Sequence, residues 1–238
     1  MYSAYPSAEA LRLFLLDAGM TPPLDLPGAV RAGIQGFERD CDRRFLAGKS
    51  IENADIGEET RRFDPAAWPG TSAYRPYHLL EFGPYGDLTS LTSVIHAPTG
   101  GTPETLALNT DYWPLPANAP SIGFPYTGLA MRRRFWAPLL PQNVHSLEVT
   151  GLWGFGTTLP ADAWRAMLIR SATLALTSIS TSAILSIAGG GLPVTGWKEA
   201  DVSEDYALVP FASAMTTARV SWKEDYAAAV MAYRRVSL

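Results

Sequence analysis

The stretch from Ser171 to Trp197 contains no Asp, Glu, Lys or Arg, and this feature restricts the possible folds more than any other. Its length alone would allow a helix to cross a bilayer, which takes about 20 apolar residues. However, serine and threonine hydroxyls occur throughout it, and Gly189, Gly190, Gly191 and Pro193 interrupt its end. We therefore expect a helix that packs between protein neighbours and no membrane span.

The whole chain is also poor in charge. Charged residues make up 18% of it and hydrophobic residues 47%, whereas soluble domains usually carry about 25% charged residues. Surface that is covered by partners would explain the difference, so the composition favours an oligomer. The net charge of -4 gives no general attraction to nucleic acid, and any DNA contact would have to be local.

The N-terminal part is predicted to form two helices. Ser7 is placed to cap the first helix, which ends before Gly19. The second is predicted to begin near Leu26-Pro27 and to stop at Gly48. Its apolar residues recur at helical spacing, and they are Val30, Ile34, Phe37, Cys41 and Phe45. Cys41, the single cysteine, is interpreted as a small hydrophobic residue of this face.

Residues 49–156 show short β-like runs separated by proline and glycine, which predicts a β-rich region. A turn is expected at Pro84 to Asp87. The expected strands are His78 to Phe82, Leu91 to His96, Thr105 to Leu108 and Ser146 to Leu152.

A long third helix is predicted to open at Pro160, with Asp162 in its first turn. A fourth is predicted to begin at Ser221, which forms a capping box with Glu224. We expect residues 189–220 between these helices to cross a surface or wrap a neighbour.

These elements predict an α+β fold: a core bundle of about four helices, with a β-rich insertion between the second and third. The expected organisation is one composite domain. Residues 1–48 form the N-terminal helical pair, residues 49–156 the β-rich insertion, and residues 157–238 the long core helix, a connecting segment and the C-terminal helix.

No catalytic, cofactor-binding or metal-binding residues are predicted. No serine has the Gly-x-Ser-x-Gly frame of a nucleophile elbow. The three histidines, His78, His96 and His145, lie in separate predicted strands without the close pairing of common zinc sites. We interpret them as isolated polar or interface residues.

The basic cluster Arg132-Arg133-Arg134, followed by Phe135-Trp136, is the strongest local electrostatic feature. The arginines could bind phosphates while the aromatic rings stack on bases or become buried. The cluster could equally contact an acidic protein surface.

Several short stretches, in order, resemble the head-to-tail connector (adaptor) proteins of long-tailed phages and gene transfer agents. The closest similarity is the run Leu147 to Gly156, with Leu159 to Asp162 opening the next helix. The other similar stretches are Ala4 to Ser7, Cys41 to Phe45, Thr60 to Asp64, Leu79 to Phe82, Leu88 to Val94 and Ala232 to Arg235. Residues 49–60 and 189–220 look longer than the family usually carries.

This resemblance implies a structural protein of the virion neck that is assembled in the host cytoplasm. It implies a ring of identical copies, typically twelve, that binds the portal, meets a tail-side stopper or tail terminator, and surrounds passing double-stranded DNA without reading its sequence. No cofactor and no membrane contact are implied. The C-terminal residues that would contact the portal are Trp222, Tyr226, Tyr233, Arg234 and Arg235, although intrachain packing is an alternative for the aromatic ones.

Two other functions remain open at this stage. The first is an enzyme with an unrecognised site in the β-rich region, near His96 or His145. The second is a nucleic-acid-binding module that uses Arg132 to Arg134, in addition to or in place of a role as connector.

Overall fold

The computed structural model describes residues 1–20, 22–23, 25–64, 77–98, 101–132, 145–188, 197–199, 202–204 and 208–235, and the side chains of these residues except 77–78, 120 and 177–220. The chain forms two compact units. The β-rich unit comprises Met1–Tyr5, Asp42–Leu159 and Arg234–Leu238, and the helical unit comprises Pro6–Cys41 and Pro160–Tyr233.

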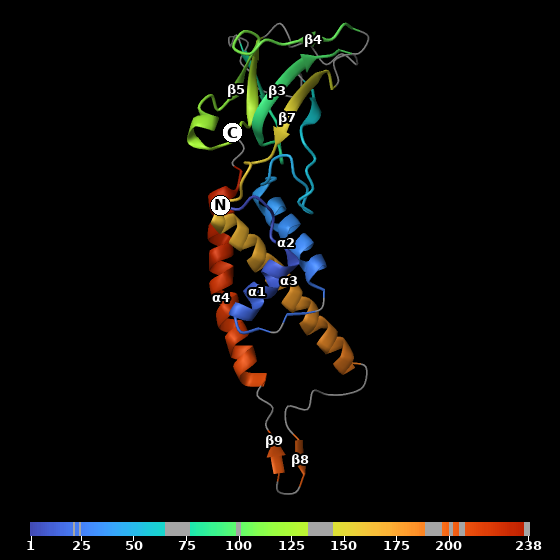
Figure 1. Ribbon diagram of the computed structural model, residues 1–238, viewed down its shortest axis with the longest axis vertical. Coiled ribbons are helices and arrows are strands. Elements are labelled where there is room, and N and C mark those ends of the chain that lie inside the picture. The colour runs from blue at the N-terminus through green and yellow to red at the C-terminus, as the bar shows by residue number, and fades with distance from the viewer. Residues whose placement is uncertain are drawn as a thin grey trace. The chain divides into compact units, whose positions relative to one another are not determined.

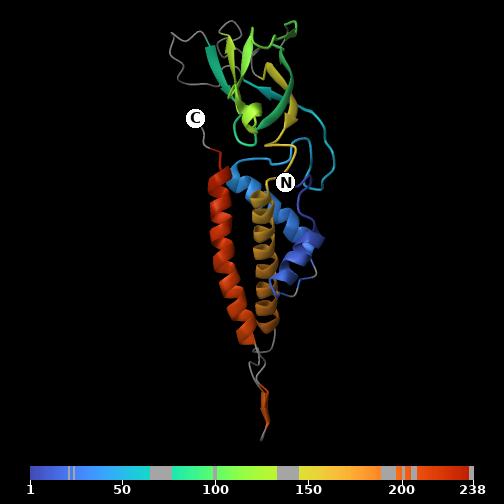
Figure 2. The same cartoon turned by 60° about the vertical axis from the view of Figure 1, so that its left-hand side comes forward.

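The helical unit contains α1 (Ala8–Asp17), α2 (Leu26–Cys41), α3 (Ala161–Ala188) and α4 (Leu208–Tyr233). Figures 1 and 2 show α3 and α4 side by side and running in opposite directions, while α1 and α2 lie against α3. Fully buried apolar side chains come from three of these helices, namely Leu11, Leu15, Ile34, Phe37 and Met167. Because the two parts of this unit are separated in sequence by the β-rich region, the helical core is assembled from both ends of the chain.

Local signals explain where several helices begin. The Ser7 side chain accepts a hydrogen bond from the backbone N–H of Ala10, as expected for an N-cap. Pro160 directly precedes α3, and the Trp164 N–H donates to its carbonyl oxygen.

The β-rich unit contains two antiparallel sheets. The four-stranded sheet has the order β1-β7-β3-β4, and the three-stranded sheet has the order β2-β6-β5. The strands are β1 (Glu59–Phe63), β2 (Tyr77–Glu81), β3 (Leu88–His96), β4 (Glu104–Thr105), β5 (Tyr112–Leu115), β6 (Gly128–Arg132) and β7 (Leu147–Trp153), and a 3-10 helix lies at Ala119–Ile122. A two-stranded hairpin of β8 (Trp197–Glu199) and β9 (Val202–Glu204) lies between α3 and α4 in sequence.

The core of the β-rich unit takes side chains from both sheets. Leu80, Leu129 and Met131 of the three-stranded sheet and Val94 and Val149 of the four-stranded sheet belong to one buried cluster. Alternation along β7 produces this arrangement, since every second residue from Leu147 to Trp153 is buried.

Trp153 at the end of β7 is the largest fully buried side chain of the described residues. Its indole N–H donates to the Glu59 carbonyl oxygen at 2.9 Å, and the Phe82 ring meets it edge-on at 5.0 Å. The Arg61 guanidinium lies 4.3 Å from its ring centre. Trp153 of β7 therefore contacts both β1 and Phe82, the residue directly after β2, within one core.

The α+β fold, with its β-rich region between the second and third helices, is confirmed. The predicted end of the second helix at Gly48 is wrong, because α2 ends at Cys41 and Asp42 adopts φ 54°. Residues after Asp42 form backbone hydrogen bonds with residues 155–156, for example from the Phe155 N–H to the Arg44 carbonyl oxygen. Phe45 is buried against the Phe155 ring in the β-rich unit, so its helical spacing from Cys41 is coincidental.

The predicted start of the fourth helix at Ser221 is also wrong, because α4 begins at Leu208 and Ser221 lies inside it. Residues 189–220 therefore include β8, β9 and the first half of α4. The strand expected at Thr105 to Leu108 is reduced to Glu104–Thr105, and β5 and β6 were not predicted. β5 contains Pro114, which is tolerated because β5 is an edge strand.

In the part of the chain that the structure describes, no helix is both long enough and apolar enough to span a membrane.

Candidate interaction groove between α3 and α4

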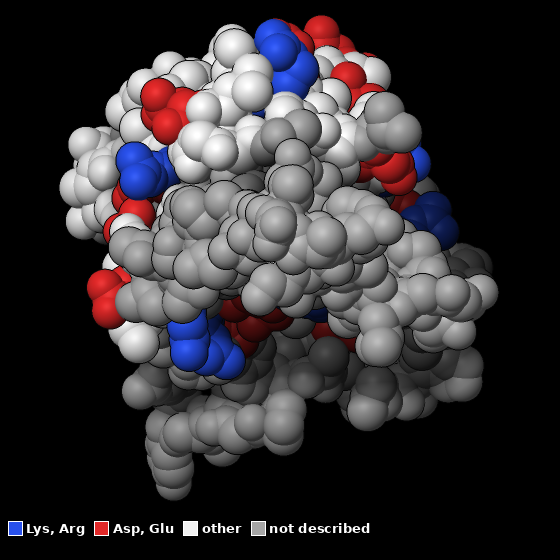
Figure 3. All heavy atoms as spheres, turned by 90° about the horizontal axis from the view of Figure 1, so that it is seen from below, with Lys and Arg blue, Asp and Glu red and all other residues white. Residues whose placement is uncertain are grey.

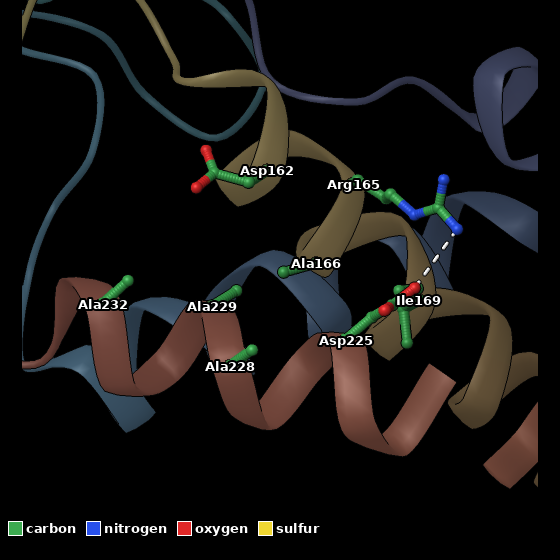
Figure 4. Close-up of a pocket in the computed structure, with 8 residues that line it drawn as sticks. All are labelled: Asp162, Arg165, Ala166, Ile169, Asp225, Ala228, Ala229 and Ala232. Carbon is green, nitrogen blue, oxygen red and sulfur yellow. Dashed lines mark hydrogen bonds and ion pairs between the residues drawn. The ribbon is translucent and has the colours of Figure 1, made fainter. Parts of the chain in front are cut away.

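A groove of about 610 Å³ lies between α3 and α4 in the helical unit (Figure 4). Its apolar lining comes from Ala166 and Ile169 of α3 and from Ala228, Ala229 and Ala232 of α4. The charged side chains at its rim are Asp162, Arg165 and Asp225. Because the three α4 residues carry only methyl groups, the space between the helices stays open.

Two polar contacts join the helices beside this groove. The Tyr233 hydroxyl donates to Asp162 Oδ1 at 2.8 Å, and Arg165 Nη2 lies 3.2 Å from Asp225 Oδ2. Burial raises the pKa of Tyr233, and the hydrogen bond to Asp162 adds to the effect, so the phenol is protonated at neutral pH. Arg165 and Asp225 neutralise each other at the rim (Figure 4).

Tyr226 forms a third polar contact, on the neighbouring face of α4. Its hydroxyl donates to Asp40 Oδ2 at 2.7 Å, and its ring meets Phe37 edge-on at 5.7 Å. The Arg170 guanidinium lies 5.7 Å from the ring centre. Burial and the bond to Asp40 raise the pKa of Tyr226. Tyr226 thereby connects α4 to α2.

We expect Tyr226→Phe to lower the free energy of unfolding by about 1 kcal/mol, because the change removes one hydrogen bond to a carboxylate and keeps the ring. Urea unfolding of Tyr226→Phe, Asp40→Ala and the double variant measures the coupling between the two side chains. The two single variants are the controls for the double variant, because each removes one partner of the same hydrogen bond. Strict additivity of the two single changes would contradict the predicted bond.

The five residues expected at the portal have different positions. Trp222 is 6% exposed and packs 5.1 Å from the Phe14 ring of α1. Tyr226 and Tyr233 make the contacts given above, so the three aromatic residues pack within the helical unit. Arg234 is exposed. A role of these five residues at a portal stays a prediction.

Arg235 is bound within the β-rich unit. Its guanidinium donates to the carbonyl oxygens of Gly83 and Thr127, the latter at 3.0 Å. Burial lowers its pKa, and the nearby carboxylate of Asp87 opposes this effect. Arg235 itself is therefore held against the loops that follow β2 and precede β6.

Of the basic cluster, Arg132 lies exposed at the end of β6, whereas Arg133 and Arg134, together with Phe135 and Trp136, lie outside the described residues. Figure 3 shows one face of the molecule, on which the described Lys and Arg side chains form small groups interspersed with Asp and Glu. No broad basic surface is present among the described residues of that face.

The three histidines, of which His96 and His145 are the candidates for an alternative site, lie in different settings. His96, at the end of β3, pairs in register with Glu104, and burial lowers its pKa. His145 precedes β7 and is exposed, with Nδ1 3.4 Å from Asp64 Oδ1. His78 lies in β2, and its side chain is outside the described set. Within the described part, no three His, Cys, Asp or Glu side chains are placed to hold a metal ion.

The chain was compared with protein-family models, curated proteins and solved structures. No protein-family model and no curated protein matches the chain. Among solved structures, the chain is similar to one from a structure described as "Neck of empty GTA particle computed with C6 symmetry", where GTA denotes a gene transfer agent. The TM-score is 0.46 and the identity 17%, over 71% of this chain and 76% of that chain.

Proposed function

We propose that this chain is a structural protein of the virion neck, an adaptor whose copies form a ring between the portal and the tail and continue the DNA channel. One observation carries the proposal. The stretches that resemble connector proteins occur in the order in which that family carries them, and they coincide with strands and with the beginnings or ends of helices.

The placement of these stretches supports the proposal at several points. Thr60 to Phe63 lie in β1, and Leu147 to Trp153 form β7. The stretch Leu159 to Asp162 leads into the first turn of α3, and Ala232 to Arg235 span the end of α4. The resemblance therefore follows the architecture and is not confined to one motif.

The physical character of the chain agrees with a ring. Head-to-tail contacts between identical copies bury two different faces of each copy, which reduces the need for surface charge. Residues 171–188 of α3 contain no charged side chain, and the whole chain has only 18% charged residues. A net charge of -4 would let DNA pass through a channel without being retained.

The proposed partners are further copies of the chain, in a ring of about twelve by the resemblance, the portal, and a tail-side stopper or terminator. Arg234, exposed at the end of α4, is the residue of the predicted portal set that is most available to a partner. Arg132 to Arg134 would face DNA or an acidic protein surface.

The test is to purify the chain alone and together with the portal protein of the same particle, measure mass by light scattering, and image the products by electron microscopy. We expect rings that sit on the portal. A chain that remains monomeric and does not bind the portal would refute the adaptor function. The alternative of an enzyme with a site near His96 or His145 would then be favoured.

We further expect Arg234→Glu to weaken portal binding at least tenfold, because it reverses a charge at the proposed interface. Arg62→Glu is the matched control, since it reverses another exposed arginine, on β1, that belongs to no proposed interface. If Arg132→Glu instead abolishes a salt-dependent affinity for DNA and Arg234→Glu changes nothing, the nucleic-acid-binding function is favoured.

A further inference from the structure

The outer face of α1 carries an apolar ridge. Leu11 and Leu15 are fully buried against the helical unit, whereas Leu13 is 53% exposed and Leu16 is 47% exposed. These two exposed leucines lie three residues apart, so their side chains are neighbours on one helix face. A short helix that is apolar on both faces has more hydrophobic surface than its own unit covers, and the second face is available to a partner.

The ridge and the α3–α4 groove have complementary properties. The ridge is convex and aliphatic, while the groove is concave and lined by the methyl groups of alanines and by Ile169. An ion pair between two residues of the same copy lies beside the ridge, and another lies beside the groove. Glu9 and Arg12 are 2.6 Å apart beside the ridge, and Arg165 and Asp225 are 3.2 Å apart beside the groove.

We propose that Leu13 and Leu16 of one copy insert into the α3–α4 groove of the next copy. This contact rests on the proposed function, because it would be the repeating contact of the ring. It uses two different surfaces of the same helical unit, so each copy offers a ridge to one neighbour and a groove to the other. Contacts of this head-to-tail kind generate a ring when the rotation between copies closes.

Charge selects a protein as the occupant of the groove. The charged residues of its rim are two acids, Asp162 and Asp225, and one base, Arg165. A nucleic acid or an anionic lipid surface would need an excess of Lys and Arg there. The ridge of a second copy would bring the closed Glu9–Arg12 pair and the exposed carboxylate of Asp17, which lies four residues from Leu13 on the same helix face. Arg165 is the base of the rim that this carboxylate would meet.

The size of the contact predicts how assembly proceeds. A helix of 10 residues in a groove of this volume buries less than the roughly 1,000 Å² typical of a stable interface. One contact should therefore be weak. In a closed ring every copy makes two contacts, and a portal that binds several copies raises their effective concentration further.

The test uses two full-length variants that each damage one surface. Leu13→Glu places a charge on the ridge and leaves the groove intact, whereas Ala228→Arg fills the groove and leaves the ridge intact. Both positions are exposed, so neither change disturbs the core. Matched controls are Met231→Glu, an apolar-to-charge change at a residue that is 82% exposed, and Ala227→Arg, an exposed alanine outside the groove lining.

We expect sedimentation over a range of concentrations to show association that is at least tenfold weaker for Leu13→Glu and for Ala228→Arg, with both controls like the natural chain. A mixture of the two variants retains one intact contact, between the ridge of Ala228→Arg and the groove of Leu13→Glu. The mixture should therefore give a dimer and nothing larger. Unchanged association of either variant, or a mixture that associates no better than its components, would overturn the proposal.

A cross-link gives a readout that does not need the portal. Mixed chains carrying Leu16→Cys or Ala228→Cys should form a disulfide between copies at high protein concentration, and Leu16→Cys mixed with Ala227→Cys should not. The native Cys41 is fully buried and does not interfere. Cross-linking without portal binding would support the contact between the ridge and the groove and would refute the adaptor function. Rings that bind the portal but do not cross-link would refute only the contact between the ridge and the groove.

Discussion

Replacing Asp87 with alanine is expected to lower the free energy of unfolding of the β-rich unit by about 3–5 kcal/mol. Both carboxylate oxygens of Asp87 lie 2.9 Å from Arg43 Nη1, and the exposed fractions of the two side chains are 0% and 12%. Burial raises the pKa of Asp87, and the charges of Arg43 and Arg235 oppose that rise. Removing the carboxylate leaves the Arg43 guanidinium buried without its counter-charge.

Urea denaturation followed by tryptophan fluorescence measures this loss. Arg62→Ala is the matched control, because it breaks an exposed ion pair with Glu148 and should cost about 1 kcal/mol or less. The double variant Asp87→Ala with Arg43→Met should be more stable than Asp87→Ala alone, since the Arg43 charge is then no longer buried beside the Arg235 charge after the carboxylate is lost. A loss for Asp87→Ala as small as that for Arg62→Ala would contradict a structural role of the buried pair.

The parts of the fold that sequence could predict are those with strong local signals. Ser7 caps α1 and Pro160 precedes α3 because capping depends on residues only a few positions apart. The alternation along β7 identifies its buried face for the same reason. In contrast, the end of α2 depends on backbone pairing of residues 44–48 with residues 153–156, which lie far away in sequence.

The groove had no signal in the sequence. Trp222, Tyr226 and Tyr233, for which intrachain packing was the alternative to a portal contact, form a stripe on α4 that contacts α1, α2 and α3. Ala228 and Ala232 lie beside that stripe and look like ordinary helix-forming residues. Their small side chains leave a groove only because α3 lies beside α4. No local sequence pattern shows that α3 is the helix that packs next to them. Similarly, the exposure of Leu13 and Leu16 depends on which face of α1 the unit covers.

Gly33→Ala is expected to lower the free energy of unfolding of the helical unit by about 2–3 kcal/mol, because the backbones of α2 and α3 lie close together at this residue. A Cβ atom at position 33 would lie 2.1 Å from Ser171 Oγ, 2.6 Å from Ser171 N and 2.7 Å from Ser171 Cα. The last two atoms belong to the backbone of α3 and cannot rotate away. The helices must separate to accept the methyl group, and the loss of packing exceeds the gain of about 1 kcal/mol in helix propensity that alanine brings.

Gly36→Ala is the matched control on the same helix. Its Cβ would meet only the Arg170 side chain, with the nearest atom at 3.2 Å, and a flexible side chain can yield. This variant should therefore be neutral or more stable by up to about 1 kcal/mol. Adding Ser171→Gly to Gly33→Ala removes Oγ but keeps the two backbone atoms, so denaturation curves should show no recovery of stability. Full recovery in that double variant would mean that the serine side chain sets the spacing of α2 and α3, and the backbone does not.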